Sequence, residues 1–153
     1  MDENDLAILA RALLETSEAA YVTTIDRQGR PQTRAMFNLR NSIQFPKLHT
    51  FFEGLDDAFE TWFTTNSAST KMDDLAVNRA VSVYYCWPTQ FRGLMLGGDI
   101  ETIVEPGDKA RLWQDGWERY YPQGQDDPDY TVLRLRPTQV KYYHQLNAVT
   151  LVG

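Results

Sequence analysis

The chain has 153 residues, with little cysteine, little histidine and no excess of positive charge. Its one cysteine, Cys86, excludes an intramolecular disulfide, and the apolar residues around it predict a buried thiol. The net charge of −6 argues against a nucleic-acid-binding surface or a polybasic membrane patch. We therefore expect a protein of the reducing cytoplasm that binds neither nucleic acid nor a membrane surface.

Long apolar runs and glycine-rich dinucleotide motifs are also missing. No run approaches the roughly 20 apolar residues of a membrane helix, and residues 1–5 are acidic where a signal peptide is basic. No Gly-x-Gly-x-x-Gly occurs, which argues against a dinucleotide fold. His49 and His144 are isolated and lack the partners of a metal site, although a haem-binding protein would need one of them as an axial ligand. No Ser/His/Asp or Cys/His grouping supports nucleophilic catalysis.

The hydrophobic pattern predicts one domain that is mainly β. Strands are expected at residues 20–25, 31–38, 60–65, 81–87, 91–104, 130–136 and 139–144. Helices are expected at 4–16 and 70–78, and a third from Pro106 that carries Trp113, Trp117, Tyr120 and Tyr121 and ends at Pro122 and Gly124. These tryptophans are interpreted as core or dimer contacts. Segment 40–58 follows neither period, so we expect an irregular excursion packed by Phe45, Phe51 and Phe52.

The number of strands and the shortness of their connections predict a β-barrel with peripheral helices. Closure would also remove the exposed strand edges that the chain does not otherwise protect. Gly97 and Gly98 lie inside the longest predicted strand, where paired glycines indicate a bulge or a barrel corner. The sequence therefore predicts a small closed barrel.

The most informative segment is residues 62–71, in which a strand opens into a hydroxyl-rich turn followed by Lys71 at the start of a helix. Hydroxyls, free backbone N–H groups and an ammonium together form a site for a phosphate. A simpler reading makes Ser69 an N-cap and Thr70-x-x-Asp73 a capping box. Arg34, a second cation that the predicted hairpin places on a neighbouring strand, favours the phosphate site. Two cations suit one phosphate dianion, so FMN fits better than FAD or NAD.

Several motifs occur together in a familiar order. They are Arg34-Ala35-Met36, Phe63-Thr64-Thr65-Asn66, Ser69-Thr70-Lys71, Asn78-Arg79-Ala80-Val81-Ser82-Val83, Gly97-Gly98 and Asp127-Pro128-Asp129-Tyr130 through Arg136-Pro137. From Tyr21 to Tyr143 the chain resembles the pyridoxamine 5′-phosphate oxidase-like family of FMN-binding split barrels, and within it the general stress protein branch. The resemblance implies a split β-barrel.

The resemblance also implies a homodimer that holds FMN at the subunit interface. Arg34 and Lys71 would contact the phosphate, and Met36, Phe37, Thr64 and Thr65 would lie along the ribityl chain and the ring edge. The implied cofactor-binding set is Arg34, Ala35, Met36, Phe37, Thr64, Thr65, Ser69, Thr70 and Lys71. Arg92 is added because it lies with Trp87 and Gln90 near the Pro88 turn, from which it could approach a cofactor edge.

Two departures separate the chain from a true oxidase. The flavin-contacting glutamine of the oxidase is replaced by Gly93, and its C-terminal arginine-and-histidine substrate motif has no counterpart after Tyr143. We therefore expect an FMN-dependent oxidoreductase of another substrate, with a small-molecule electron donor or acceptor. A flavin-binding stress protein without turnover and an enzyme of this fold that uses the deazaflavin F420 are the alternatives.

Overall fold

The computed structural model describes all 153 residues and contains eight strands and four α-helices. The helices are α1 (Glu3–Leu14), α2 (Pro46–Glu53), α3 (Thr70–Val77) and α4 (Pro106–Leu112). The strands are β1 (Ala19–Ile25), β2 (Pro31–Phe37), β3 (Thr61–Asn66), β4 (Ala80–Trp87), β5 (Arg92–Ile103), β6 (Tyr130–Leu135), β7 (Gln139–His144) and β8 (Asn147–Val152). Three short 3₁₀ helices are η1 (Pro88–Gln90), η2 (Trp117–Arg119) and η3 (Gly124–Asp126). No helix is both long enough and apolar enough to span a membrane.

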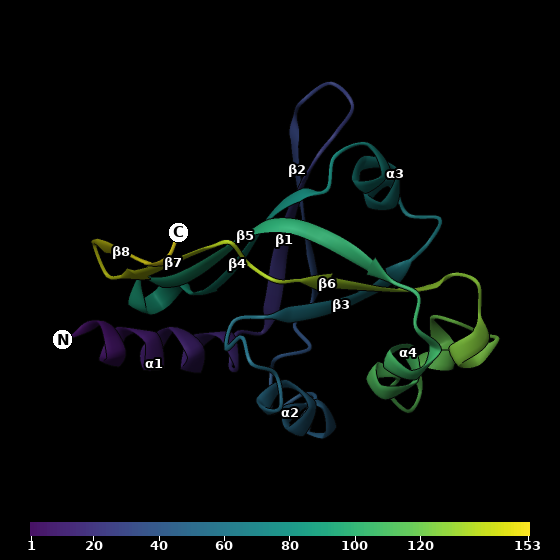
Figure 1. The fold of residues 1–153 in the computed structure, drawn as a ribbon, viewed down its shortest axis with the longest axis horizontal. Coiled ribbons are helices and arrows are strands. Elements are labelled where there is room, and N and C mark those ends of the chain that lie inside the picture. The colour runs from purple at the N-terminus through teal and green to yellow at the C-terminus, as the bar shows by residue number, and fades with distance from the viewer.

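All strands pair antiparallel in one curled sheet of order β2-β1-β4-β5-β6-β3, and the β7–β8 hairpin branches from β5. The barrel is split, because β2 and β3 approach each other without a ladder of hydrogen bonds between them. The predicted barrel is confirmed, whereas its complete closure was wrong. The α1 helix and the β7–β8 hairpin lie at one end of the long axis, and α4 lies at the other (Figure 1).

The corner that the paired glycines predicted lies in β5. Residues 92–97 of β5 pair with β7, whereas Ile100–Ile103 pair with β6, and the register with β4 runs through this point without a bulge. A Cβ atom at Gly98 would lie 3.3 Å from the Leu135 side chain and 3.3 Å from the Thr138 backbone nitrogen. The glycine therefore makes room for the chain as it crosses from β6 to β7.

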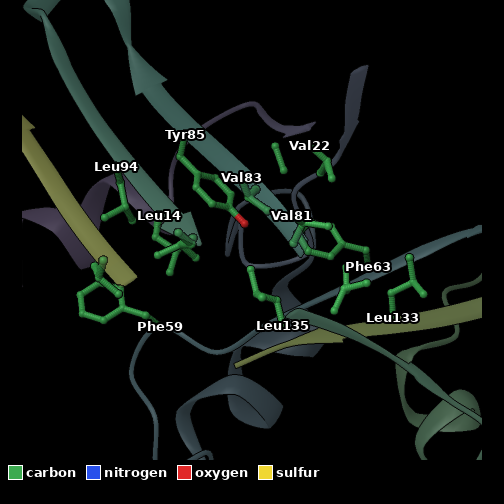
Figure 2. Close-up of a cluster of buried hydrophobic side chains, with 14 of the residues drawn as sticks. Leu14, Val22, Phe59, Phe63, Val81, Val83, Tyr85, Leu94, Leu133 and Leu135 are labelled. Atoms are coloured by element: carbon green, nitrogen blue, oxygen red, sulfur yellow. The ribbon is translucent and has the colours of Figure 1, made fainter. Parts of the chain in front are cut away.

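Two clusters of buried side chains form the core. The larger fills the barrel, where Val81, Val83 and Tyr85 of β4 lie opposite Phe63 of β3 and Leu135 of β6 (Figure 2). The smaller cluster lies under α2 and α4 and includes Phe52, Trp62, Trp117 and Tyr130. It covers the outer side of β3 and β6, so these strands are apolar on both faces.

The predicted third helix is wrong beyond its first two turns. The α4 helix ends at Leu112, Trp113 is extended, and Gly116 has a φ of +90° that a helix cannot accommodate. Trp117 and Tyr121 still pack with Tyr130. The aromatic spacing therefore predicted the burial of Trp117 and Tyr121 correctly, but Tyr120 is exposed and the helix is shorter than predicted.

Three further predictions need correction. Strand β8 was not predicted, because the turn before it, Gln145-Leu146, contains no glycine and Gln145 itself adopts a φ of +56°. Cys86 is only partly buried, since the alternation of β4 points Tyr85 into the core and Cys86 outward. The excursion at 40–58 contains α2, although its packing by Phe45, Phe51 and Phe52 is as predicted.

Candidate functional site

A cleft opens where the barrel is split. It has a volume of about 600 Å³ and is bordered on one side by β2 and on the other by the end of β3. Of the predicted site residues, Ala35, Met36, Phe37, Thr64, Thr65 and Lys71 line it. The gap between the two strand edges therefore brings together segments that the sequence separates by about thirty residues.

The turn that closes one end of the cleft is held from behind by Asp129. Its carboxylate accepts hydrogen bonds from the Asn66 side chain and from the Ala68 backbone N–H, the latter at 3.0 Å. These donors, Asn66 first, lower the pKa of Asp129. The Asp129 backbone carbonyl accepts a further bond from Ser67 N–H at 3.0 Å. This anchoring fixes the residues that lead into α3.

Ser69 is the N-cap residue of α3, but its hydroxyl does not cap the helix. The backbone is extended, the side chain accepts no bond from the helix, and the buried Oγ has no hydrogen-bond partner. The predicted N-cap position of Ser69 is confirmed, whereas the side-chain capping bond expected of it is not made. A buried hydroxyl without a partner is costly, which marks a position that a ligand can satisfy.

Lys71 supplies the ammonium at this end of the cleft. Its Nζ donates to Thr65 Oγ1 at 2.6 Å, and no carboxylate lies within ion-pair distance. Burial lowers the pKa of Lys71, and the nearby charge of Arg34 lowers it further. The protonated lysine is therefore held in an unfavourable environment that an anion would relieve.

Arg34 is positioned by β1 and α3. Its Nη1 donates to Thr24 Oγ1 at 2.8 Å, while Asp74 lies 3.9 Å from Nη2. Thr24 in turn donates to Asp74 at 3.0 Å, which ties β1 to α3. Burial lowers the pKa of Arg34, and Asp74 opposes this effect. Nε and Nη2 have no hydrogen-bond partner, so one side of the guanidinium remains available.

The other end of the cleft is aromatic. Phe37 makes edge contacts with Phe45 and Tyr120, at centroid distances of 6.1 and 5.9 Å. Trp117, Tyr120 and Tyr121 form the wall, and Gln44 brings the 40–58 excursion to the mouth. The sequence analysis assigned Trp117 to the core, and it is both buried and a cleft residue. Only the broken turns after α4 could have revealed this wall, and the sequence was read there as a helix.

Four of the predicted residues do not line the cleft, and one of them is Arg34, which lies near Lys71. Thr70 faces a separate shallow hollow with Asp73 and Asp74, Ser69 lies behind the wall, and Arg92 lies at the far end of the sheet. At Gly93, a Cβ atom would overlap the Tyr84 hydroxyl. The Tyr84 side chain thus occupies the space that a side chain at position 93 would need.

The chain matches known proteins over nearly its whole length. The model of the pyridoxamine 5′-phosphate oxidase family matches residues 7–144. A solved structure from Clostridium acetobutylicum, of a protein related to general stress protein 26, is 34% identical and has a TM-score of 0.75, and the match covers 98% of this chain and 95% of that one. No curated protein sequence matches.

More distant structures share the fold. General stress protein 26 from Bacillus anthracis is 14% identical with a TM-score of 0.68, and the match covers 97% of each chain. A haem-binding protein from Mycobacterium smegmatis is 16% identical with a TM-score of 0.67, and the match covers 95% of this chain but 58% of that one. With the family match and the Clostridium relative, they agree with the split barrel. This chain belongs to the pyridoxamine 5′-phosphate oxidase family.

Proposed function

We propose that this protein binds FMN in the cleft between β2 and β3 and acts as an FMN-dependent oxidoreductase of the cytoplasm. The observation that carries the proposal is Lys71, which lines one end of the cleft without a carboxylate partner and lies close enough to Arg34 for that charge to lower its pKa. At the start of the same helix, the buried Ser69 hydroxyl has no hydrogen-bond partner. A phosphate dianion would neutralise both cations and accept a hydrogen bond from the serine. The three groups supply complementary charge and donors for one phosphate.

The remainder of the cleft suits the rest of FMN. Its volume of about 600 Å³ is in the range of sites for molecules of this size. Strand β2 pairs only with β1, so peptide groups along its free edge, near Ala35 and Met36, can bond the polar edge of a flavin. Phe37 and Tyr120 offer apolar surface for a planar ring system.

FMN, when bound, supplies the redox chemistry, and the protein supplies binding, orientation and access. Gln44 and Phe45 place the 40–58 excursion beside the aromatic end, so we propose that this segment limits which donor or acceptor reaches the cofactor. Gly93, which stands where the resemblance predicts a flavin-contacting glutamine in the oxidase, supports a substrate other than pyridoxamine 5′-phosphate. Neither histidine lines the cleft, since His49 pairs with Glu53 on α2 and His144 ends β7, so haem is not favoured there.

We further propose a homodimer with FMN at the subunit interface. Tyr21 of β1 lies opposite Tyr84 of β4 in register, and the rings of Tyr84 and Tyr143 of β7 are 6.2 Å apart across β5. Tyr21 and Tyr84 are 41% and 38% exposed, and contiguous exposed aromatic surface is typical of interfaces. The interface should bury more than about 2,000 Å² in total.

Light scattering at micromolar concentration tests the dimer. We expect a dimer for the native protein and a monomer for Tyr84→Asp, which places a charge in the aromatic patch. Ile43→Asp, on the exposed excursion, is the matched control and should remain a dimer. A native monomer that still holds FMN would overturn the interface site.

The absorbance spectrum of freshly purified protein tests the cofactor. FMN gives absorbance bands at about 370 and 450 nm, F420 gives a band at about 420 nm, and haem gives a Soret band. Anaerobic addition of NADH or NADPH, followed by oxygen or quinones, then tests turnover. A flavin that every donor fails to reduce would support the alternative of a flavin-binding stress protein without turnover.

A further inference from the structure

A second hollow lies at the other end of the molecule, beside the β7–β8 hairpin and the N-terminal helix α1 (Figure 1). Its volume is about 610 Å³, and its walls come from the turn around η1 and from the turn between β7 and β8. It shares no lining residue with the cleft that we assign to FMN. No acidic side chain lines it.

Both turns that form this hollow carry backbone strain. Phe91 has a φ of +49° and Gln145 a φ of +56°, and they are the only residues other than glycine with a positive φ. The left-handed conformation is unfavourable for such side chains, and strained residues of this kind gather at ligand-binding sites. Two such residues lie on opposite walls of one hollow. Reversal of the chain alone does not require this strained conformation, so a further role of these two turns is indicated.

Arg92 is the only arginine that is not fully exposed and that has no carboxylate partner. The other arginines that are partly or fully buried are Arg11, Arg34, Arg40 and Arg134. Each of these four has an acidic group within 4.0 Å. The Arg92 guanidinium instead lies 4.7 Å from the Trp87 ring and donates from Nε to the Tyr142 hydroxyl at 2.8 Å. Its Nη1 and Nη2 also donate, at 3.4 Å each, to Gln90 Oε1 and to the Leu9 carbonyl. These neutral groups and the aromatic rings orient the guanidinium, and no carboxylate compensates its charge.

His144 adds a second donor. The Tyr142 hydroxyl accepts from Arg92 and lies 3.0 Å from His144 Nδ1, to which it can donate when the imidazole is neutral. A neutral imidazole that accepts at Nδ1 carries its proton at Nε2, and Nε2 has no partner in the protein. The hollow thus presents one positive charge and one neutral donor, which suits a monoanion better than a dianion.

The rim of the hollow is apolar. The Phe91 side chain is 72% exposed and that of Leu146 is 96% exposed, one on each of the two strained turns. Large apolar side chains held at such exposure offer surface for the apolar body of a ligand. We propose that this hollow binds a small organic carboxylate, with its charged group on Arg92 and His144 and its apolar body against Phe91 and Leu146.

Benzoate is the probe, and the purified full-length protein with its bound cofactor is titrated by NMR, following the Trp87 indole and His144 ring signals. Benzyl alcohol, with the same ring and no charge, and inorganic phosphate, with charge and no ring, are the comparison ligands. We expect saturable binding of benzoate and binding weaker by about tenfold or more for both comparison ligands. Equal binding of benzyl alcohol or phosphate would overturn the proposal.

Arg92→Met should weaken benzoate binding by about tenfold or more. Arg27→Met, at an exposed arginine without an ion pair, should leave benzoate binding unchanged. Leu146→Glu keeps the proposal testable if Arg92→Met does not fold, because it adds a repelling charge at an exposed position and should also weaken benzoate. If Arg92→Met instead weakens FMN, or only shifts the monomer–dimer equilibrium, the hollow belongs to the cofactor site or to the interface and the proposal fails.

Discussion

Two regions of this protein gather cations, and they differ in how those cations are paired. The phosphate end of the cleft contains Lys71 and Arg34, with only Asp74 nearby at 3.9 Å from Arg34. A groove of about 550 Å³ beside α2 and α4 contains four cations, Lys47, Arg111, Arg134 and Arg136. By count alone, this basic groove would be the better anion site.

The pairing reverses that conclusion. Arg134 lies 3.0 Å from Glu101, Arg136 lies 3.0 Å from Glu60, and Lys47 lies 3.1 Å from Asp115. Arg111 has Asp108 at 3.9 Å and also lies over the Phe51 ring at 4.8 Å. A paired cation must give up its carboxylate before it binds another anion, whereas Lys71 gives up only its bond to Thr65. The difference teaches that a missing partner, and not the number of cations, identifies the anion site.

The largest expected effect follows from removing either Lys71, which has no carboxylate partner, or Arg34, whose one acidic neighbour is Asp74 at 3.9 Å. Lys71→Met and Arg34→Met should each weaken FMN binding by about tenfold to a hundredfold, since each loses a charge-assisted hydrogen bond of roughly 1.5–3 kcal/mol. Arg111→Met in the basic groove is the matched control and should leave FMN affinity unchanged. Fluorescence titration of the apoprotein with FMN measures all three, and an equal loss in the control would break the comparison.

Removing a carboxylate charge from the basic groove tests the same comparison from the other side. Glu60 is buried and accepts from Trp62 Nε1 at 2.8 Å as well as from Arg136. Glu60→Gln should lower the free energy of unfolding by about 1–3 kcal/mol, because it removes the charge that these donors bond. The same change should let the groove bind inorganic phosphate more tightly than the native groove does. Urea unfolding and phosphate titration measure the two effects, and an unchanged phosphate affinity would contradict the pairing argument.

Ser69 offers a smaller test with a matched partner. Ser69→Ala should weaken FMN by a few-fold to about tenfold and leave stability nearly unchanged, because the hydroxyl caps no helix. Asp2 is a true N-cap, which accepts from Asp5 N–H at 2.8 Å. Asp2→Ala should therefore cost about 1 kcal/mol of stability and leave FMN affinity unchanged. Thermal unfolding and FMN titration of both variants measure these effects. If Ser69 were merely a cap, Ser69→Ala would lower the stability and leave FMN affinity unchanged.

The smallest effect is on proton binding. Burial and Arg34 lower the pKa of Lys71 in the folded protein. At pH values between this pKa and the ordinary pKa of lysine, the unfolded chain binds more protons than the folded one. The free energy of unfolding therefore rises with pH in this range. A bound phosphate favours the ammonium and should raise the pKa. FMN affinity should then fall as the pH rises through the pKa of free Lys71, and Lys71→Met should remove that dependence. An NMR titration of the lysine Cε signal in the free and bound protein measures the shift.

The sequence predicted most of the sheet and one end of the site. The alternation of apolar residues located seven of the eight strands, and the hydroxyl-rich turn with Lys71 and the hairpin with Arg34 pointed to the phosphate end. The wall formed by Trp117 and Tyr121 escaped prediction, because both residues were placed on one helix that in fact ends at Leu112. The partners of the Arg34 side chain could not be predicted from the sequence either. Thr24 and Asp74, which hold Arg34, are fifty positions apart and bond to each other.

The most direct test of the central claim compares FMN with riboflavin, which lacks the phosphate. Dissociation constants for both are measured by fluorescence titration of the native apoprotein and of Lys71→Met. If Lys71 and Arg34 bind the phosphate, Lys71→Met should weaken FMN binding by about tenfold or more and riboflavin binding much less. Equal losses for FMN and riboflavin would contradict the assignment of the phosphate to Lys71 and Arg34.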